Sequence, residues 1–429
     1  MKNFQIILIV VFIFAAIVGL LVFSGAIPLG GKDQEGGQGT VILWGTFKTE
    51  SLSGLLEDFN NVNQSYIVRY VQKNPETFDQ ELLEALASGI GPDMFFLPDN
   101  LAFHYGNKIF AVPYDNYPLA SFKKNFVQAG EVFLTSQSIL AFPMTVDPLV
   151  MYYNRSMLDA NGIVAPPDNW NDFISLAPVL TKKDETNKII KSAVGFGHFS
   201  NVSHAKDILS ALFMQTGNKI VTERGGFMVS DLGESTGVYS LEDILKFYTD
   251  FADPLKNVYS WNKSFPTSRD FFSTNNLAFY FGYASELPSL VNKNPNQDFW
   301  VTEIPQIEGS GFKLTSARVT GLAISAFSKN INTAFLAASQ MSSGDFASKL
   351  SKNLGVVPAR RDLLKTVPAD AYSPVFYVSA LYAKSWLDPS PKDTDDIFRR
   401  MIDGVLSSNF EPREAVSDAN AKLYLLLNK

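Results

Sequence analysis

Alternating segments between residues 40 and 97 restrict the fold more than any other feature of the sequence. Three short runs have the length and composition of strands, and the first and third are apolar enough to be buried. Two segments between them carry large apolar residues at helical spacing, and Gly89 with Pro92 ends the second. In order, these pieces occupy 40–44, 52–59, 66–71, 78–86 and 94–97. Such strand–helix alternation predicts an open, mostly parallel α/β sheet covered by helices.

The length of the chain indicates more than one such unit. Its 429 residues exceed one ordinary domain and suit two lobes. Apolar residues make up 46% of the chain and charged residues 18%, so a large core can form. The alternation also returns later, with strand-like runs at 193–196, 277–281 and 300–304 and helical spacing at 334–341 and 397–406. The fold class predicted is therefore a two-lobed α/β protein.

The N-terminal segment is apolar from Ile6 to Phe23 without a charge. Its eighteen residues would span roughly 27 Å as a helix, close to the ~30 Å hydrocarbon core of a bilayer. The apolar region of a cleavable signal peptide is shorter, roughly 7–15 residues. Residues 1–27 are therefore predicted to form a signal-anchor transmembrane helix, and the glycine-rich stretch 28–39 a flexible linker.

Cleavage is the alternative for this segment, because Ser24-Gly25-Ala26 supplies the small residues that a signal peptidase accepts. Cleavage near Ala26 would release a secreted protein, whereas the uncleaved chain would cross the cell membrane once. Both alternatives place the folded part outside the cytoplasm, so an extracytoplasmic location is expected.

Composition argues against several classes of function. A net charge of −7 disfavours nucleic acid, which requires clustered Lys and Arg. The chain has no cysteine and only three histidines, which removes thiolate sites and leaves little for a transition metal. A Gly-x-Ser-x-Gly sequence at 233–237 has no histidine downstream, as an α/β-hydrolase requires. We expect no catalytic residue, no metal and no cofactor.

Candidate ligand-binding residues follow two of the predicted strands. In open α/β sheets, ligands bind beyond the carboxyl ends of the strands. Each candidate also has a structural alternative, such as core packing for the Trp that ends the first strand and turn formation for the pair after the third. The candidates are Trp44, Thr46, Phe47 and Lys48 after the first strand, and Asp99 and Asn100 after the third.

Several motifs occur in a fixed order along most of the chain. They are VILW at 41–44, LLEDFN at 55–60, LASGIGPD at 86–93, DPLVMYYNR at 147–155, PPDNW at 166–170, FSTNNLAFYFG at 272–282, GLAIS at 321–325 and LGVVPAR at 354–360. Each motif is weak alone, but the ordered set resembles the family 1 extracellular solute-binding proteins of ABC importers. That group includes maltose- and oligosaccharide-binding proteins. Many relatives carry a cysteine after the signal sequence, which this chain lacks.

The resemblance implies a periplasmic-binding-protein-like (type II) fold with ligand in the cleft between two lobes. Lobe 1 would comprise 40–146 plus 305–350, and lobe 2 would comprise 147–304 plus 351–429. It also implies a non-enzymatic receptor that closes on a mono- or oligosaccharide and delivers it to ABC permease subunits. Membrane attachment would rest on the N-terminal helix.

The resemblance adds ligand-binding candidates at the crossover and on lobe 2. Aromatic rings pack on the C–H face of a sugar, while carboxylates and amides pair with its hydroxyls. An acidic residue at the crossover would accept hydrogen bonds from sugar hydroxyls. The added candidates are Asp147, Phe199, Asn201, Tyr283, Ser285, Glu286 and Trp386.

Two other classes of function stay open from sequence alone. One is a membrane-tethered surface receptor or sensor of the same fold, binding a peptide or other small polar solute without an importer. The other is a glycan-active enzyme, because 43 Asp and Glu residues allow a catalytic carboxylate pair that nothing singles out.

Overall fold

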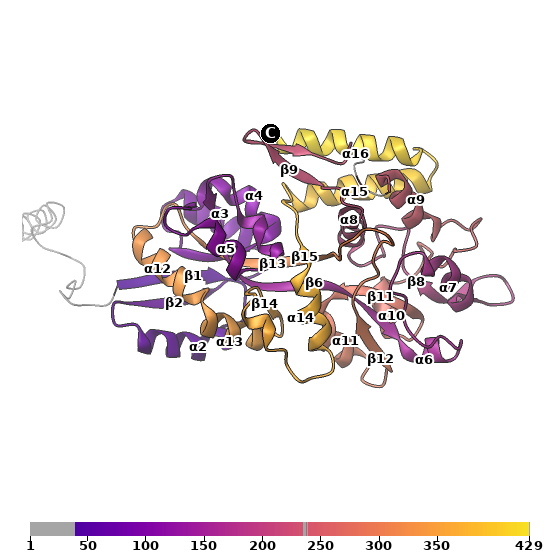
Figure 1. Ribbon diagram of the computed structural model, residues 1–429, viewed down its shortest axis with the longest axis horizontal. Coiled ribbons are helices and arrows are strands. Elements are labelled where there is room, and N and C mark those ends of the chain that lie inside the picture. The colour runs from indigo at the N-terminus through magenta and orange to yellow at the C-terminus, as the bar shows by residue number, and fades with distance from the viewer. Residues whose placement is uncertain (1–38, 235–236, 238, 429) are drawn as a thin grey trace, which may run out of the picture.

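A computed structural model describes residues 39–234, 237 and 239–428 (Figure 1). The predicted signal-anchor helix, 1–27, and the predicted linker up to residue 38 lie outside the described residues. Gly39, assigned to the linker, is the first residue of strand β1. Within the described part of the chain, no helix is both long enough and apolar enough to span a bilayer.

The predicted alternation between 40 and 97 is confirmed. Three parallel strands pair in the order β2, β1, β3. Strand β3 is buried along most of its length, whereas in β2, at the edge of the sheet, only Tyr66 and Val68 are buried. These elements, with the helices that connect them, are β1 (Gly39–Gly45), α2 (Thr49–Val62), β2 (Tyr66–Gln72), α3 (Phe78–Ala87) and β3 (Met94–Pro98). They form the larger part of lobe 1, on the left in Figure 1.

Two long strands run from one lobe into the other. Strand β6 (Ala141–Asn154) and strand β13 (Thr315–Ile324) are antiparallel, with Asp147 opposite Arg318. At one end β13 also pairs with β3 of lobe 1, and at the other β6 pairs with β11 (Leu277–Tyr283) of lobe 2. A third crossing is made by β15 (Ala383–Lys384), which pairs with β13. One sheet therefore continues through both lobes, in the order β2-β1-β3-β13-β6-β11-β8-β7.

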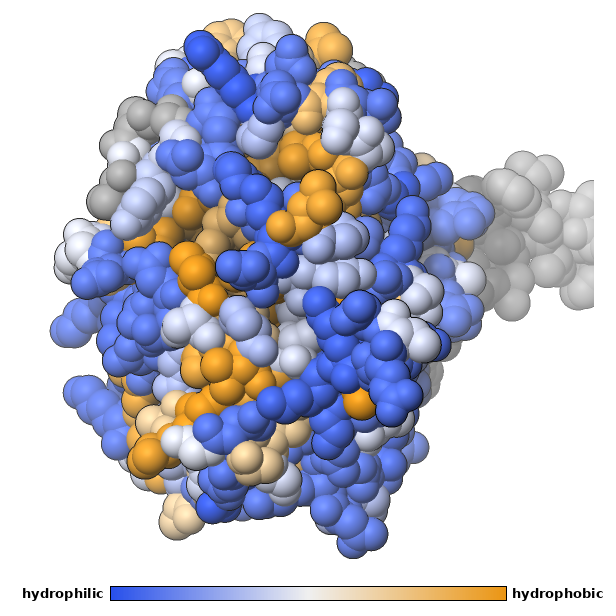
Figure 2. Space-filling view, turned by 90° about the vertical axis from the view of Figure 1, so that its right-hand side faces the viewer, coloured by the Kyte–Doolittle hydropathy of each residue, from blue (hydrophilic) through white to orange (hydrophobic). Residues whose placement is uncertain are grey.

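Lobe 2 is built on the far end of this sheet, and helices α8, α9, α15 and α16 pack together above it (Figure 1). Its strands and helices are β7 (Lys182–Lys183), β8 (Ile189–Val194), β12 (Phe299–Thr302), α6 (Arg155–Asp159), α7 (Asp172–Leu180), α8 (Ala205–Gln215), α9 (Leu241–Asp250), α10 (Ser268–Ser273), α11 (Leu287–Lys293), α15 (Pro391–Leu406), α16 (Pro412–Leu427) and the hairpin β9 (Val221–Arg224) and β10 (Phe227–Ser230). The end of lobe 2 that points away from lobe 1 shows apolar side chains among hydrophilic ones (Figure 2).

The remaining elements complete lobe 1 and the region around the crossings. They are α4 (Ala102–Tyr105), β4 (Val112–Pro113), α5 (Leu119–Asn125), the 3-10 helix η3 (Gln128–Phe133), β5 (Ser138–Ile139), α12 (Ile331–Met341), α13 (Gly344–Leu354), β14 (Val357–Pro358) and α14 (Ser373–Leu381). Strand β14 pairs with the lobe 1 half of β6, and the N–H of Arg361 donates to the carbonyl of Asn125. By contrast, the N–H of Trp170 in lobe 2 donates to the carbonyl of Gln306. The lobe limits given above stay a prediction. These contacts favour ending the first part of lobe 2 later than residue 304, and the second part of lobe 1 later than residue 350.

The core of lobe 2 is rich in aromatic rings. Trp170, expected to be a core residue, is 5% exposed and stacks at 5.3 Å on Phe281, with Phe173 and Phe196 beside it. Its indole N–H donates to Oε1 of Gln215 at 2.6 Å, so the one polar atom of the ring is satisfied. This packing gives lobe 2 a rigid base for the segments that face lobe 1.

Candidate functional site

A cavity of about 670 Å³ lies where the lobes meet, above the crossing strand β13. Lobe 1 contributes the ends of β1 and β3 and the start of α3, while lobe 2 contributes the starts of α8 and α15. The charged and aromatic residues that line it are Phe78, Asp79, Asp99, Phe199, His204, Lys206, Asp207, Tyr283, Arg318, Trp386, Asp388 and Asp395. Strand ends and helix starts converge here, as expected for a ligand site of an open α/β sheet.

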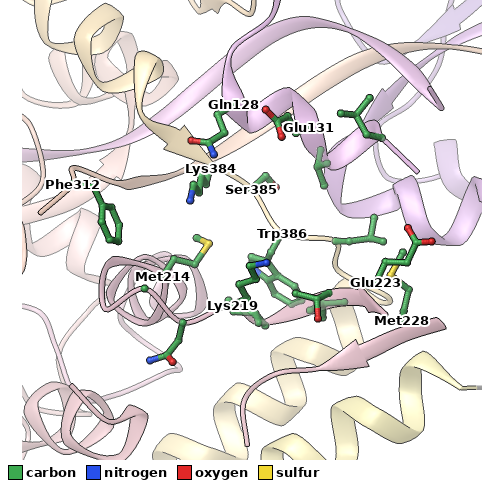
Figure 3. Close-up of a pocket in the computed structure, with 18 residues that line it drawn as sticks. Gln128, Glu131, Met214, Lys219, Glu223, Met228, Phe312, Lys384, Ser385 and Trp386 are labelled. Carbon is green, nitrogen blue, oxygen red and sulfur yellow. The ribbon is translucent and has the colours of Figure 1, made fainter. Parts of the chain in front are cut away.

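A second cavity of about 580 Å³ lies beside the crossing segment 384–387 (Figure 3). It is lined by η3 of lobe 1 and by the β9–β10 hairpin and the end of α8 of lobe 2. Ser385 and Trp386 line both cavities. The third crossing therefore separates two spaces, each of which has walls from both lobes.

Arg318 stands at the floor of the first cavity. Its guanidinium carbon lies 3.9 Å from the centre of the Tyr283 ring, a cation–π contact. Its Nη2 lies 3.7 Å from a carboxylate oxygen of Asp207 and 3.4 Å from Nδ1 of His204. The side chain is nevertheless 55% exposed, which leaves guanidinium N–H groups able to donate to a ligand.

The carboxyl of Asp99 enters the cavity from the end of β3 and is 6% exposed. The Ser385 hydroxyl of the crossing segment donates to it. Burial raises the pKa of Asp99 to about 6, although the bond from Ser385 and the charge of Arg318 act in the opposite direction.

His204 and Glu286 form a tight pair at the edge of the cavity, with 2.6 Å between Nε2 and Oε1. Glu286 also accepts from the Tyr280 hydroxyl at 2.7 Å and the N–H of Tyr283 at 2.9 Å, and Arg269 lies 3.2 Å away. Burial would raise the pKa of Glu286, but the His204 hydrogen bond and these donors lower it to about 2. Glu286 is thus held as a carboxylate by the protein itself.

Lys206 joins the first turns of two lobe 2 helices. Its Nζ lies 3.0 Å from Asp388 and 2.6 Å from Asp395, and it donates to the Thr394 hydroxyl at 3.1 Å. The side chain of Asp388 is 5% exposed, whereas that of Asp395 is 45% exposed and borders the cavity. The ammonium group therefore fixes the starts of α8 and α15 on one wall of the cavity.

The structure brings part of the predicted ligand-binding set together. Predicted residues from the ends of β1 and β3, the loop after β8, the end of β11 and the third crossing line the same cavity. They are Thr46, Asp99, Asn100, Phe199, Tyr283 and Trp386. That they contact a ligand stays a prediction.

The other predicted residues are not among those that line this cavity. In lobe 1, Trp44 lies under the Lys73 ammonium at 3.7 Å, Phe47 packs edge-on against Phe96, and Lys48 precedes α2. At the crossover, both carboxylate oxygens of Asp147 accept from Ser285, from its N–H at 2.9 Å and its hydroxyl at 2.6 Å.

Asn201 faces the interior of lobe 2 rather than the cavity. Its amide donates to the carbonyls of Asn262 and Phe265, and its oxygen accepts from the Trp261 indole at 3.0 Å. Gly197, at φ 92°, begins this loop, and a Cβ there would stand 2.4 Å from that of Ala252. The internal bonds of Asn201 instead fix a loop whose neighbours Phe199 and His204 line the cavity.

Several lining residues were absent from the sequence-based set. Lys206 and Asp207 begin the helix after β8, so the strand-end rule could have found them a few residues further along the chain. Asp395 lies near the start of α15, which begins at Pro391. No local signal marks Arg318, because its position follows from the pairing of β13 with β6.

Among the described residues, no group of three or more His, Asp or Glu side chains is arranged to hold a metal ion. The buried polar groups around the cavity are mostly bonded to one another. The geometry therefore offers hydrogen-bond donors, carboxylate acceptors and two partly exposed rings, Phe199 and Trp386, around a space of ligand size.

Comparison with known proteins identifies relatives of this arrangement. A cyclo/maltodextrin-binding protein complexed with maltotetraose has a TM-score of 0.74 at 15% identity, covering 91% of this chain and 98% of that chain. An ABC transporter solute-binding protein from Thermotoga lettingae bound with α-D-tagatose has a TM-score of 0.66 at 19% identity, covering 91% and 100%. The maltose/maltodextrin-binding domain from Bdellovibrio bacteriovorus bound to maltotriose has a TM-score of 0.63 at 16% identity, also covering 91% and 100%.

These likenesses confirm the predicted two-lobed fold. The sequence itself matches the family described as bacterial extracellular solute-binding proteins over residues 44–343, which is more than half of the chain. This chain belongs to the bacterial extracellular solute-binding protein family.

Proposed function

We propose that this protein is a receptor that binds a saccharide between its lobes and delivers it to an ABC import permease. The observation that carries the proposal is the cavity of about 670 Å³ above the crossing strands, with polar walls from both lobes, in a member of a solute-binding family. Carboxylates such as Asp99 accept from sugar hydroxyls, and the Arg318 guanidinium donates to them. Phe199 and Trp386 offer apolar surface to the C–H faces of the rings.

Closure of the lobes is the mechanism that this arrangement supports. Asp99 and Asn100 of lobe 1 and Phe199 and Asp207 of lobe 2 line the cavity, so a ligand that filled it would touch both lobes. It therefore binds the closed form better than the open form and shifts the equilibrium toward closure. The crossing strands absorb the motion. No covalent step is required, and the permease would recognise the closed surface.

We further propose that the N-terminal apolar segment holds the receptor at the outer face of the cell membrane. The segment 6–23 has the length of a membrane span, and the glycine-rich residues after it would let the lobes turn toward a permease. N-terminal sequencing of the protein recovered from membranes should return residues before Gly25. Recovery from the medium with a new N-terminus near Ala26 would contradict the tether.

Labels on opposite sides of the cavity test both ligand class and closure. The chain has no cysteine, so Glu76→Cys with Lys392→Cys introduces thiols at only two places, beside the cavity-lining Pro75 and Pro391. In the full-length protein, a saccharide that binds should shorten the distance between the two labels, measured by energy transfer or electron spin resonance. Short peptides and amino acids should leave it unchanged.

A matched pair within lobe 1, Val62→Cys with Glu76→Cys, controls for effects of the labels, and its distance should not respond to ligand. If peptides rather than saccharides shorten the interlobe distance, the saccharide assignment is wrong. If saccharides bind without any change in distance, the closing mechanism is wrong.

A further inference from the structure

Carboxylates outnumber basic groups on the walls of the interlobe cavity. Five aspartates line it, against one lysine and one arginine. Both basic groups already have partners, since Lys206 contacts Asp388 and Asp395 while Arg318 lies near Asp207. After these pairings the described walls keep an excess of carboxylates over basic groups.

The carboxylates in excess belong to both lobes. Asp79 and Asp99 stand on lobe 1, while on lobe 2 Asp388 and Asp395 share the single charge of Lys206. Closing the lobes on a neutral ligand would bring these like charges together in a space with less water, where their repulsion grows. The raised pKa of Asp99 already reflects its poor access to water in this cavity. A positive charge between the lobes would turn the same carboxylates into favourable contacts from both sides.

We propose that the physiological ligand is a saccharide that carries a protonated amine, an inference that rests on the proposed receptor function. Its ammonium group would lie among the carboxylates of the two lobes, and its hydroxyls would pair with Arg318 and Asn100. The side chain of Asp395 is 45% exposed at the edge of the cavity, so one carboxylate oxygen can serve a ligand while the other stays near Lys206. Ammonium–carboxylate hydrogen bonds are roughly twice as strong as neutral ones.

The test compares three sugars that differ only at one position. Calorimetric titration of the full-length protein with glucosamine, glucose and N-acetylglucosamine separates a charged amine from a hydroxyl and from a neutral amide. The corresponding β-1,4-linked disaccharides extend the comparison to a longer ligand. We expect the amine form to bind at least tenfold more tightly than either neutral form. The preference should decline as salt screens the charges and as the pH rises through the pKa of the amine.

Variants of single carboxylates test which of them cause the preference for the amine. Asp395→Asn and Asp79→Asn each remove one carboxylate, from opposite lobes, without changing the size of the side chain. Each should lower the ratio of amine affinity to neutral-sugar affinity several-fold. Asp345→Asn is the matched control, because Asp345 is 83% exposed on α13 and does not line the cavity. It should leave all three affinities unchanged.

The outcomes separate this inference from the receptor function. Equal or tighter binding of the neutral sugars would overturn the amine assignment and leave the saccharide receptor in place. Failure of every sugar in the series to bind would count against both. Binding of a divalent cation such as Ca²⁺ at the same aspartates, with no preference for the amine, would assign the excess charge to a metal and overturn the inference.

Discussion

Replacing Lys206 by methionine should lower the free energy of unfolding by about 3–5 kcal/mol, because it leaves the buried carboxylate of Asp388 without its cation. Methionine keeps most of the length and apolar volume of the lysine stem, so the loss reports the charge rather than a cavity. The Thr394 hydroxyl and the N–H of Ser390 still donate to Asp388, but neither carries a positive charge. Urea unfolding followed by circular dichroism measures the change.

The pH dependence of this loss has a definite sign. Burial raises the pKa of Asp388 and Lys206 lowers it, so the variant should have a still higher pKa in the folded state. A carboxyl whose folded pKa exceeds its unfolded value costs stability as the pH rises through the folded pKa, and not below the unfolded one. The variant should therefore lose more stability, relative to the parent protein, at pH 8 than at pH 5.

Two further variants test whether the loss of stability is caused by an unpaired buried charge. Adding Asp388→Asn to Lys206→Met should restore much of the lost stability, since no buried charge is left unpaired. Asp395→Asn alone should cost under about 1 kcal/mol, because that partner is 45% exposed and its pair with Lys206 is screened by water. A loss that is the same at both pH values, and that Asp388→Asn does not restore, would show that packing rather than charge is responsible.

The sequence predicted the architecture where local pattern and global fold agree. The runs at 40–44, 66–71 and 94–97 are short, apolar and separated by helical spacing, so each constrains the same parallel sheet. Within this fold, three residues that the strand-end rule selected line the cavity, namely Thr46, Asp99 and Asn100. The other three, Trp44, Phe47 and Lys48, do not line it.

Contacts that depend on register or on three-dimensional packing were beyond the reach of the sequence. Asp147 and Arg318 are opposite each other across two crossing strands, yet Arg318 lines the cavity and Asp147 is bonded to Ser285. A shift of one residue in that pairing would turn each side chain to the other face of the sheet. Asp147 was predicted from its place in the family resemblance. Arg318 was missed, because sequence spacing alone does not specify the register of strands about 170 residues apart.

Sequence alone also does not specify whether a loop side chain points into the cavity or into the interior of the protein. Asn201 was predicted to contact ligand from the resemblance to solute-binding proteins, and an amide suits sugar hydroxyls. Its polar atoms are instead used by Trp261, Asn262 and Phe265, three residues some sixty positions later in the chain. A polar side chain serves whichever unsatisfied groups surround it, and here these groups belong to the protein.

Trp261→Ala should be the most destabilising single change in this part of lobe 2, with a loss of about 3–5 kcal/mol in the free energy of unfolding. Trp261 is 0% exposed and packs edge-on against Phe265 at 5.2 Å and Phe271 at 5.6 Å. The truncation opens a cavity in a closely packed site and removes the donor to Asn201. Urea unfolding measures the loss, with Trp300→Ala as a control at a partly exposed tryptophan.

The same substitution should also weaken ligand binding, although Trp261 does not line the cavity. Asn201 lies between Phe199 and His204 in the loop that Trp261 holds. Without that contact the two side chains would be positioned less precisely, and ordering the loop would reduce the affinity for ligand. Trp261→Phe helps to separate the two roles, because it keeps one aromatic ring in the packing and removes the indole N–H together with the rest of the fused ring. We expect it to lose about 1–3 kcal/mol of stability and to bind ligand with an affinity between those of the parent and the alanine variant. Unchanged affinity in both variants, with stability lowered as expected, would show that the loop after β8 is positioned without the bond from Trp261 to Asn201.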